Sequence, residues 1–245
     1  MDQMFQSSCG WELAGAGRDN PPIWHRFGFT DHLCALASVE ATLLALRRRD
    51  QTGEGQMVTA SLLGATVLTV SEAMGLPGGS LTPVAQIDPL QLGLHPFERI
   101  YQASDGWIAV SEPDPARQAS MIAVLGAVDA AACEARIREG SQVDVLERLA
   151  SAQVACAPVR TSQRDAFFDA PGNRAIGLRA VYDHPVYGAL EQPGRFWDFG
   201  DLQPRLDRPP PTIGQHTAEV LADLGFSATE VAQLYEAPAS PLVAS

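Results

Sequence analysis

Residues 30–63 read TDHLCALASVEATLLALRRRDQTGEGQMVTASLL, and this stretch decides the fold. From His32 to Arg49 it has neither Gly nor Pro and is apolar around most of its circumference, which predicts a largely buried helix. The three arginines at its end suit the negative end of the helix dipole. After a turn at residues 50–55, GQMVTASL (55–62) predicts a short strand, and LLGATVLTVSEAMG (62–75) predicts a second apolar helix.

The sequence changes character on either side of this stretch. Residues 1–30 carry scattered Gly and Pro, which predicts irregular backbone with one short helical piece. Residues 76–97 are rich in Pro and Gly and predict a linker at a domain boundary. After the linker, Asp105-Gly106 lies between two alternating runs, which predicts a hairpin. Further elements are then expected as a strand at 155–159 and helices at about 114–125, 128–139, 142–153 and 161–168.

The last third of the chain predicts a return path followed by two helices. Residues 177–211 alternate strand-like pieces with Pro and Gly, which is typical of a segment that crosses a surface. Two amphipathic helices are expected at residues 212–224 and 227–236. Ser227 and Glu230 have the spacing of a capping box at the start of the second helix.

Composition excludes several classes of protein. With 245 residues, 46% of them hydrophobic, the chain is long enough to bury a core. Its net charge of -12 leaves no basic field for nucleic acid or anionic lipid. No signal-peptide pattern and no uninterrupted apolar stretch of membrane-spanning length is found, so we expect a soluble cytoplasmic protein. The cysteines lack CxxC spacing, which favours reduced thiols over a zinc or redox site; they are Cys9, Cys34, Cys133 and Cys156.

Two carboxylates of the deciding stretch are candidates for chemistry. Asp31 directly precedes the expected helix, where an Asp most often serves as N-cap. The same position at the positive end of a helix also keeps a carboxylate ionised, so that it could act as a nucleophile or a base. Glu40 lies in the middle of the apolar helix, where a buried carboxylate needs a partner. A structural ion pair is the favoured interpretation of Glu40, with an auxiliary role in a site as the alternative.

Basic residues flank Asp31, but other catalytic signatures are missing. His25, Arg26 and His32 could bind an anion or assist proton transfer, although a histidine near a helix start is more often a surface or capping group. No two histidines have metal-ligand spacing, so we expect no metal site. The sequence contains no GxSxG motif and neither phosphate-loop pattern. Residue chemistry alone therefore leads to a carboxylate site.

The order of these segments resembles class III CoA-transferases, the family of formyl-CoA transferase and α-methylacyl-CoA racemase. The resemblance covers almost the whole chain. It implies an α/β fold with a partial Rossmann-like large domain, a small α+β domain, and a chain that returns to the large domain at the C-terminus. The implied boundaries are 1–75 for the remainder of the large domain, 76–97 for the linker, 98–176 for the small domain and 177–245 for the return. The stretches that carry it are residues 30–63, HPFERIYQASDGWIAV (95–110), and the tail, above all RPPPTIGQHTAEVLADLGFSATEVAQL (208–234).

By position, the resemblance identifies Asp31 as the family's catalytic aspartate. In transferases this residue attacks an acyl-CoA, forms a mixed anhydride and then carries CoA as an aspartyl thioester. In racemases the equivalent carboxylate moves the α-proton of a 2-methylacyl-CoA, and Asp114 lies near another racemase carboxylate. Arg26 and His32 are candidates for contacting CoA, which is expected as a thioester substrate and not as a permanently bound cofactor. The absence of the glycine-rich loop common in transferases leaves both reactions open.

The sequence also resembles the family without its N-terminal portion, the Rossmann-like region that supplies much of the CoA-binding surface. We therefore expect a homodimer, interlocked as in the family, or a complex with a chain that supplies the missing part. A third hypothesis is a catalytically incomplete subunit that serves as an association module. The expected substrates are an acyl-CoA and a carboxylic acid, with no nucleic acid and no membrane as partner.

Overall fold

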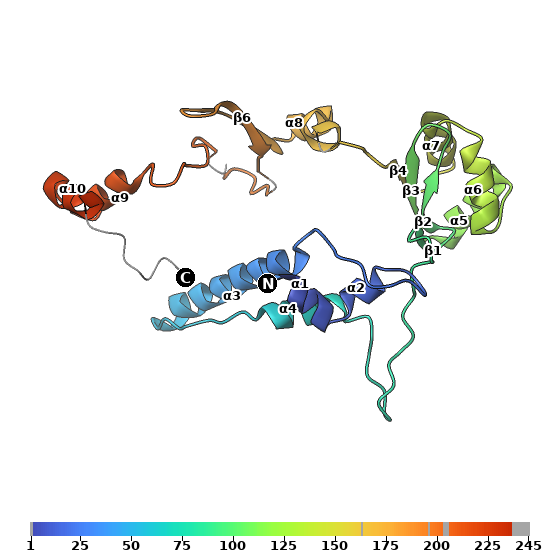
Figure 1. Ribbon diagram of the computed structural model, residues 1–245, viewed down its shortest axis with the longest axis horizontal. Helices are drawn as coiled ribbons and strands as arrows, with labels where there is room; N and C mark the ends of the chain where they lie inside the picture. Colours follow the sequence, from blue (N-terminus) through green and yellow to red (C-terminus); the bar gives the residue numbers. More distant parts are fainter. Residues whose placement is uncertain (1, 163, 196, 203–205, 237–245) are drawn as a thin grey trace. The chain divides into compact units, whose positions relative to one another are not determined.

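The computed structural model describes residues 2–162, 164–195, 197–202 and 206–236 (Figure 1). Internal contacts divide the chain into two units, residues 1–159 and 160–245. The first unit contains α1 (Asp2–Ser8), α2 (Trp11–Ala14), α3 (Phe29–Thr52), α4 (Leu62–Thr69), β1 (Gly93–His95), β2 (Glu98–Gln102), β3 (Trp107–Ser111), α5 (Pro115–Leu125), α6 (Ala130–Arg138), α7 (Gln142–Ser151) and β4 (Cys156–Pro158). The second contains the π-helix η1 (Arg164–Phe168), α8 (Pro171–Ala175), β5 (Arg179–His184), β6 (Gly188–Pro193), α9 (Thr217–Asp223) and α10 (Ala228–Glu236).

The lead-in to α3, residues 2–28, is more ordered than its composition indicates. One short helical piece was expected in residues 1–30, and the structure has two, α1 and α2. Helices this short need tertiary contacts to form. Trp11 of α2 supplies them, because its ring packs edge-on against Phe29 at a centroid distance of 5.1 Å and its indole N–H donates to the hydroxyl of Thr69. Trp11 thus joins α2 to the start of α3 and the end of α4.

The central helix α3 is longer than predicted and largely exposed. It begins at Phe29 and ends at Thr52, and its C-cap Gly53 has φ 76° and donates its amide to the carbonyl of Arg49 at 2.7 Å. The prediction of a largely buried helix is wrong, since Thr30 is its buried residue and most of its leucines are exposed. Contacts with α1 and α4 cover only part of its circumference. An apolar pattern predicts that a helix packs against other structure, but it does not identify the element that it packs against.

Among the described residues, α3 also has the length and composition of a membrane-spanning helix. The expectation that no stretch of this chain reaches that length was therefore too strict. Length and composition are weak evidence of a span, because buried core helices of water-soluble proteins share both properties.

The strand predicted at residues 55–62 does not form. Residues 54–61 have neither helix nor strand structure, and Figure 1 shows them as an extended run between α3 and α4. No described residue forms a backbone hydrogen bond with residues 55–60, so the segment lacks the neighbouring strand that a β-ladder requires. The following helix, α4, starts as expected at Leu62, with Ser61 accepting the amide of Gly64 at 3.2 Å. It ends at Thr69, earlier than predicted.

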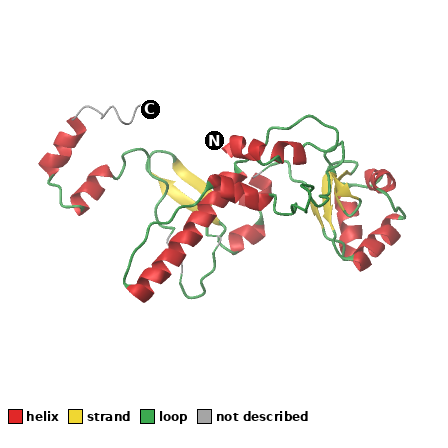
Figure 2. Cartoon of the chain, turned by 90° about the horizontal axis from the view of Figure 1, so that it is seen from below, coloured by secondary structure: helices red, strands yellow, loops and turns green. Residues whose placement is uncertain are grey.

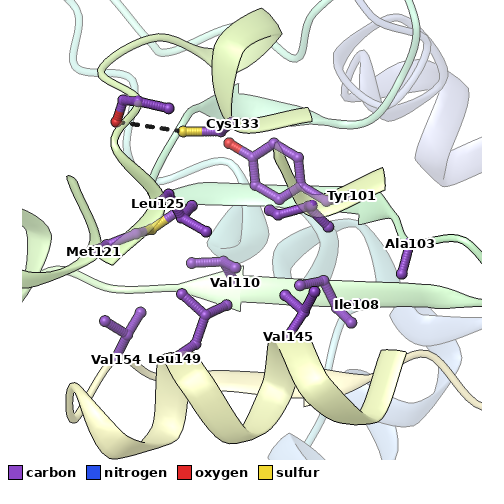
Figure 3. Packing of buried hydrophobic residues seen from close by; sticks show 12 residues of the cluster. Tyr101, Ala103, Ile108, Val110, Met121, Leu125, Cys133, Val145, Leu149 and Val154 are labelled. Atoms are coloured by element: carbon purple, nitrogen blue, oxygen red, sulfur yellow. Dashed lines mark hydrogen bonds between the residues drawn. The ribbon is translucent and has the colours of Figure 1, made fainter. Parts of the chain in front are cut away.

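The small part, which runs from β1 to β4 and contains α5, α6 and α7, has its elements close to the positions predicted for them. The Asp105-Gly106 turn joins β2 to β3, and the sheet has the antiparallel order β1-β2-β3-β4. The helices α5, α6 and α7 follow near the expected residues and enclose one hydrophobic core with the sheet. Figure 3 shows Val145 and Leu149 of α7 directed at Ile108 and Val110 of β3. On the other side of the strands, Tyr101 lies against Cys133, whose thiol donates to the carbonyl of Ala127.

Part of the predicted linker is tied to the lead-in. Strand β1 lies inside residues 76–97 and pairs with β2. The amide of Arg18 donates to the carbonyl of Ile87 at 2.8 Å, and Asp88 forms an ion pair with the half-buried Arg99. Gly17 has φ 83°, and a Cβ there would collide with the carbonyl of Asp88. The close approach of these two segments therefore requires glycine at position 17.

The second unit contains the expected strand-and-loop region. The strands β5 and β6 form an antiparallel hairpin, and His184 holds its turn, because its Nδ1 accepts the amides of Val186 and Tyr187 at 3.0 and 3.1 Å. Helix α9 begins at Thr217, five residues later than predicted. Helix α10 agrees with its prediction, and the capping box is confirmed by reciprocal bonds between Ser227 and Glu230.

The fold is therefore mixed α/β, as expected, with one detail unconfirmed. Figure 2 shows the strands in two separate groups, and every pairing in the described residues is antiparallel. The described part of residues 1–75 is helical without a strand. A Rossmann-like domain needs a parallel sheet, which this segment does not form by itself.

Candidate active site

The N-terminus of α3 carries Asp31 in an arrangement that the sequence did not predict. Sequence context alone favoured Asp31 as the N-cap, yet the structure places it inside the first turn, because the helix begins at Phe29. The N-cap residue is Gly28, which has no side chain to offer. The capping carboxylate comes instead from Asp2, whose Oδ2 accepts the amide N–H of Asp31 at 2.8 Å.

Asp2 is itself buried and held by Gln6. The side-chain amide of Gln6 donates to Asp2 Oδ1 and, at 3.1 Å, to the carbonyl of Phe27. Since this amide nitrogen donates, the Gln6 oxygen accepts, and His25 must carry its proton on Nδ1 to bond it at 3.1 Å. Burial favours the neutral form of Asp2, but the hydrogen bonds from the Asp31 amide and from Gln6 outweigh it and lower the pKa of Asp2.

The carboxylate of Asp31 is left exposed and uncommitted to capping. A Cβ built on Gly28 would lie 3.3 Å from Asp2 Oδ2 and 3.8 Å from Asp31 Oδ2, so the two carboxylates flank the same glycine. Asp2 faces inward with 6% of its surface exposed, whereas Asp31 faces solvent. A carboxylate that makes no capping bond is free to act as a nucleophile or a base.

The predicted basic neighbours lie on both sides of the start of α3, Arg26 in the preceding loop and His32 in the first turn. Arg26 and His32 are both exposed. His32 Nδ1 donates to the carbonyl of Gly28 at 2.6 Å, and its ring stacks on Phe27 at 4.9 Å between centroids. His32 therefore has a fixed orientation with Nε2 directed away from the helix backbone. His25 is turned to the other side, between Gln6 and Gly15.

Glu40 lies elsewhere on the helix and is exposed, which corrects the prediction of a buried, paired carboxylate. Nine residues of helix separate it from Asp31, which corresponds to about 14 Å along the axis and to the opposite side of the cylinder. The structure does not bring these two carboxylates together. The apolar surroundings in the sequence suggested burial, but the helix face that carries Glu40 is uncovered.

Asp114 has a capping role in the small part. It is the N-cap of α5, where its carboxylate accepts the amide of Ala116 at 2.8 Å. Its neighbour Glu112 was missed by the sequence reasoning and is buried at 1% exposure. The amide of Ala155 and the Arg117 side chain donate to Glu112 at 2.9 Å each, the amide bond first among the causes that hold its pKa below the usual range. The local pattern EPDP gave no signal for this burial, because Ala155 is distant in the sequence.

An apolar pocket of about 420 Å³ lies beside α1 and α2. Leu13, Ile23 and Trp24 form much of its lining, and Trp24 is 76% exposed. Ser7 donates to Glu12 at 2.7 Å on the polar side of the pocket. The pocket shares α1 with the Asp2–Gln6 pair and could hold an uncharged group.

The described residues contain no cluster of three His, Cys, Asp or Glu side chains that could hold a metal ion.

Comparisons with known proteins agree on one family. The model of CoA-transferase family III matches residues 1–217. A curated "Acyl-CoA transferase" from Fusarium pseudograminearum is 25% identical over 258 residues, which is 96% of this chain and 56% of the relative. A CaiB/BaiF family protein from Brucella suis superposes with a TM-score of 0.68 at 21% identity, over 91% of this chain and 62% of that chain. A hypothetical protein from Mycobacterium tuberculosis gives 0.63 at 15% identity, over 89% and 62%.

These likenesses differ in what they establish. At identities below one quarter, the solved structures show a shared fold. The chain spans little more than half the length of the curated relative and 62% of these two solved chains. The family model extends over most of the chain, from the lead-in through α3 and the small part to the start of α9. The chain therefore belongs to CoA-transferase family III.

Proposed function

We propose that the chain takes part in the transfer of CoA from an acyl-CoA thioester to a carboxylic acid, with the carboxylate of Asp31 as nucleophile. The observation that carries this proposal is the free Asp31 side chain in the first turn of α3. Asp2 fills the capping role that would otherwise occupy it. The family membership supports CoA thioesters as the substrate class.

The reaction would proceed by four acyl-transfer steps through the carboxyl group of Asp31. The Asp31 carboxylate attacks the acyl carbonyl and expels CoA as thiolate, which leaves a mixed anhydride. The thiolate attacks the aspartyl carbonyl, releases the acyl carboxylate and forms an aspartyl-CoA thioester. The acceptor carboxylate attacks that thioester and expels the thiolate again. In the last step CoA attacks the acceptor carbonyl, and the Asp31 carboxylate is restored.

The apolar pocket beside α1 supports an uncharged acyl group as part of this proposal. Its lining offers Leu13, Ile23 and Trp24 to the substrate, and the carboxylate of Glu12 would repel a second negative charge. Arg26 and His32 remain the proposed contacts for the anionic part of CoA. Both are exposed at the helix end that carries Asp31.

Mass spectrometry after incubation with an acyl-CoA and hydroxylamine tests the proposal. Hydroxylamine converts an aspartyl anhydride or thioester into a hydroxamate, so we expect this modification on Asp31 and its loss in Asp31→Asn. Asp50→Asn is the matched control, because Asp50 is an exposed aspartate at the other end of α3. Solvent deuterium entering the α-carbon without a trapped Asp31 would replace the proposal by racemisation. If neither trapping nor exchange is observed, that result favours a catalytically incomplete subunit.

We further propose that the chain associates with a second copy. Two neighbouring features support this. The exposed face of α3 carries Leu36, Val39 and Leu43, which are 57%, 58% and 61% exposed. Residues 55–60, which follow this helix, have backbone groups that no described residue pairs. The apolar helix face lacks a surface to pack against, and the extended segment lacks a neighbouring strand. A second copy of the chain would supply both.

A further inference from the structure

The capping of α3 by Asp2 is a long-range contact with a specific consequence. Helix α1 is separated from α3 by 20 residues of sequence, yet it delivers a carboxylate to the amide of Asp31. A buried carboxylate is unfavourable unless donors surround it. Asp2 receives donors from Asp31 and Gln6, which satisfy both of its oxygens.

This contact fixes the backbone from which the nucleophile projects. Because the Asp31 amide is bound, the direction of its Cα–Cβ bond is defined relative to α1. Gly28 leaves room beside the capping bond, since a Cβ there would lie only 3.3 Å from Asp2 Oδ2 and would come into contact with Asp31 Oδ2 at 3.8 Å. The backbone position of Asp31 is thus fixed, the space beside its side chain is open, and its own carboxylate makes no capping bond.

Gln6 adds a second constraint on the same turn. Asp2 and Gln6 are one helical turn apart on α1 and therefore share a face. Gln6 is completely buried, and its amide holds both Asp2 and the carbonyl of Phe27, in the loop that leads into α3. The pair fixes the helix end from two sides.

We propose that Asp2 and Gln6 are positioning residues for the Asp31 carboxylate, acting through the Asp31 amide and the Phe27 carbonyl without touching substrate. This inference rests on the proposed role of Asp31 as nucleophile. A misplacement of about 1 Å at a reacting group can lower a rate by roughly 100-fold. The predicted effect of losing Asp2 is therefore on the rate of adduct formation and not on substrate affinity.

The test measures hydroxamate formation on Asp31 against acyl-CoA concentration in the full chain. Asp2→Ala should lower the limiting rate roughly 10- to 100-fold and leave the half-saturating concentration unchanged. Asp2→Asn keeps an acceptor for the Asp31 amide and should recover most of the rate. The control is Asp129→Ala, since Asp129 caps α6 by the same kind of bond, to the amide of Ala132 at 2.8 Å. It should lose similar stability and retain the rate.

Asp2→Ala that folds and forms the adduct at the rate of the unmodified chain would overturn the proposal. If Asp2→Ala does not fold, Gln6→Met keeps the Asp2 side chain and removes the bonds of Gln6 to Asp2 Oδ1 and to the Phe27 carbonyl. An unchanged rate in that variant has the same meaning.

If the unmodified chain forms no adduct, the proposed function fails separately. Positioning is then decided by amide hydrogen exchange, with the Asp50 amide as internal reference. Asp2→Ala removes the acceptor of the Asp31 amide and should speed exchange at Asp31 while leaving exchange at Asp50 unchanged. Equal exchange at Asp31 in the two chains would refute the inference.

Discussion

Serine in place of two leucines on α3 should weaken self-association strongly. Leu36 and Leu43 lie two turns apart on one face and are 57% and 61% exposed. Full burial of a leucine contributes about 1.5–3 kcal/mol, so covering the exposed three-fifths of each would contribute about 1–2 kcal/mol. Leu36→Ser combined with Leu43→Ser should therefore cost about 2–4 kcal/mol of association free energy. That corresponds to a dissociation constant raised roughly 25- to 700-fold.

Sedimentation over a concentration series measures this constant directly. The control is Leu90→Ser, because Leu90 is 72% exposed in a loop outside α3 and its loss removes a similar apolar surface. Circular dichroism verifies that both variants keep their helices. A dissociation constant that is equal for the double variant and the control, or an unmodified chain that stays monomeric at every concentration, would refute the assignment of α3 to an interface.

Two further predictions concern stability. Leu149→Ala leaves a cavity at a fully buried site between α7 and β3 and should lower the free energy of unfolding, measured in urea, by about 2–5 kcal/mol. Val143→Ala on the exposed side of α7 should change it by less than about 0.5 kcal/mol. Equal effects of the two variants would contradict the core assignment. Acid should also destabilise the chain. Asp88 is partly buried, but hydrogen bonds from the Leu90 amide and Arg99 lower its pKa below the value in the unfolded chain. Its stabilising contribution is therefore present above about pH 4 and is lost as the pH falls further. Asp88→Asn should flatten that acid limb in pH-dependent unfolding, and Glu54→Gln, at an exposed turn, should leave it unchanged.

The small part was predictable because its signals are local. The Asp105-Gly106 turn fixes one hairpin, and the apolar periodicity of α5, α6 and α7 gives each helix a face for the sheet. The capping box of Ser227 and Glu230 was equally visible, since both partners lie within one turn. In each case the residues that stabilise an element are close to it in the sequence or repeat with its own period.

The lead-in and the central helix were harder because their stabilising contacts are distant. Trp11 supports α2 through Phe29 and Thr69, and no periodicity in residues 1–30 announces this. The pattern of residues 55–62 has strand character, but a strand also needs a neighbour, and the described chain supplies none. Propensity therefore gave the right tendency for this segment and the wrong element.

The site shows the same division between a visible residue and an invisible support. Asp31 stood out because it directly precedes a long apolar stretch and because the resemblance identifies it by position, and the interpretation as an N-cap was chemically reasonable. Asp2 gave no comparable signal, because its role depends on α1 folding back onto the end of α3. A sequence pattern can thus identify the group that reacts while missing the group that holds it.

The two proposals about α3 are physically connected. Its N-terminal turn carries Asp31, while the apolar face formed by Leu36, Val39 and Leu43 begins little more than one turn later. Helix α3 is held at its N-terminus by Asp2 and packs against α1 and α4, while its apolar face stays uncovered. Covering that face would add a restraint on the orientation of the helix and with it on the Asp31 carboxylate. The contacts that complete the surface of α3 would therefore also complete the positioning that Asp2 and Gln6 begin.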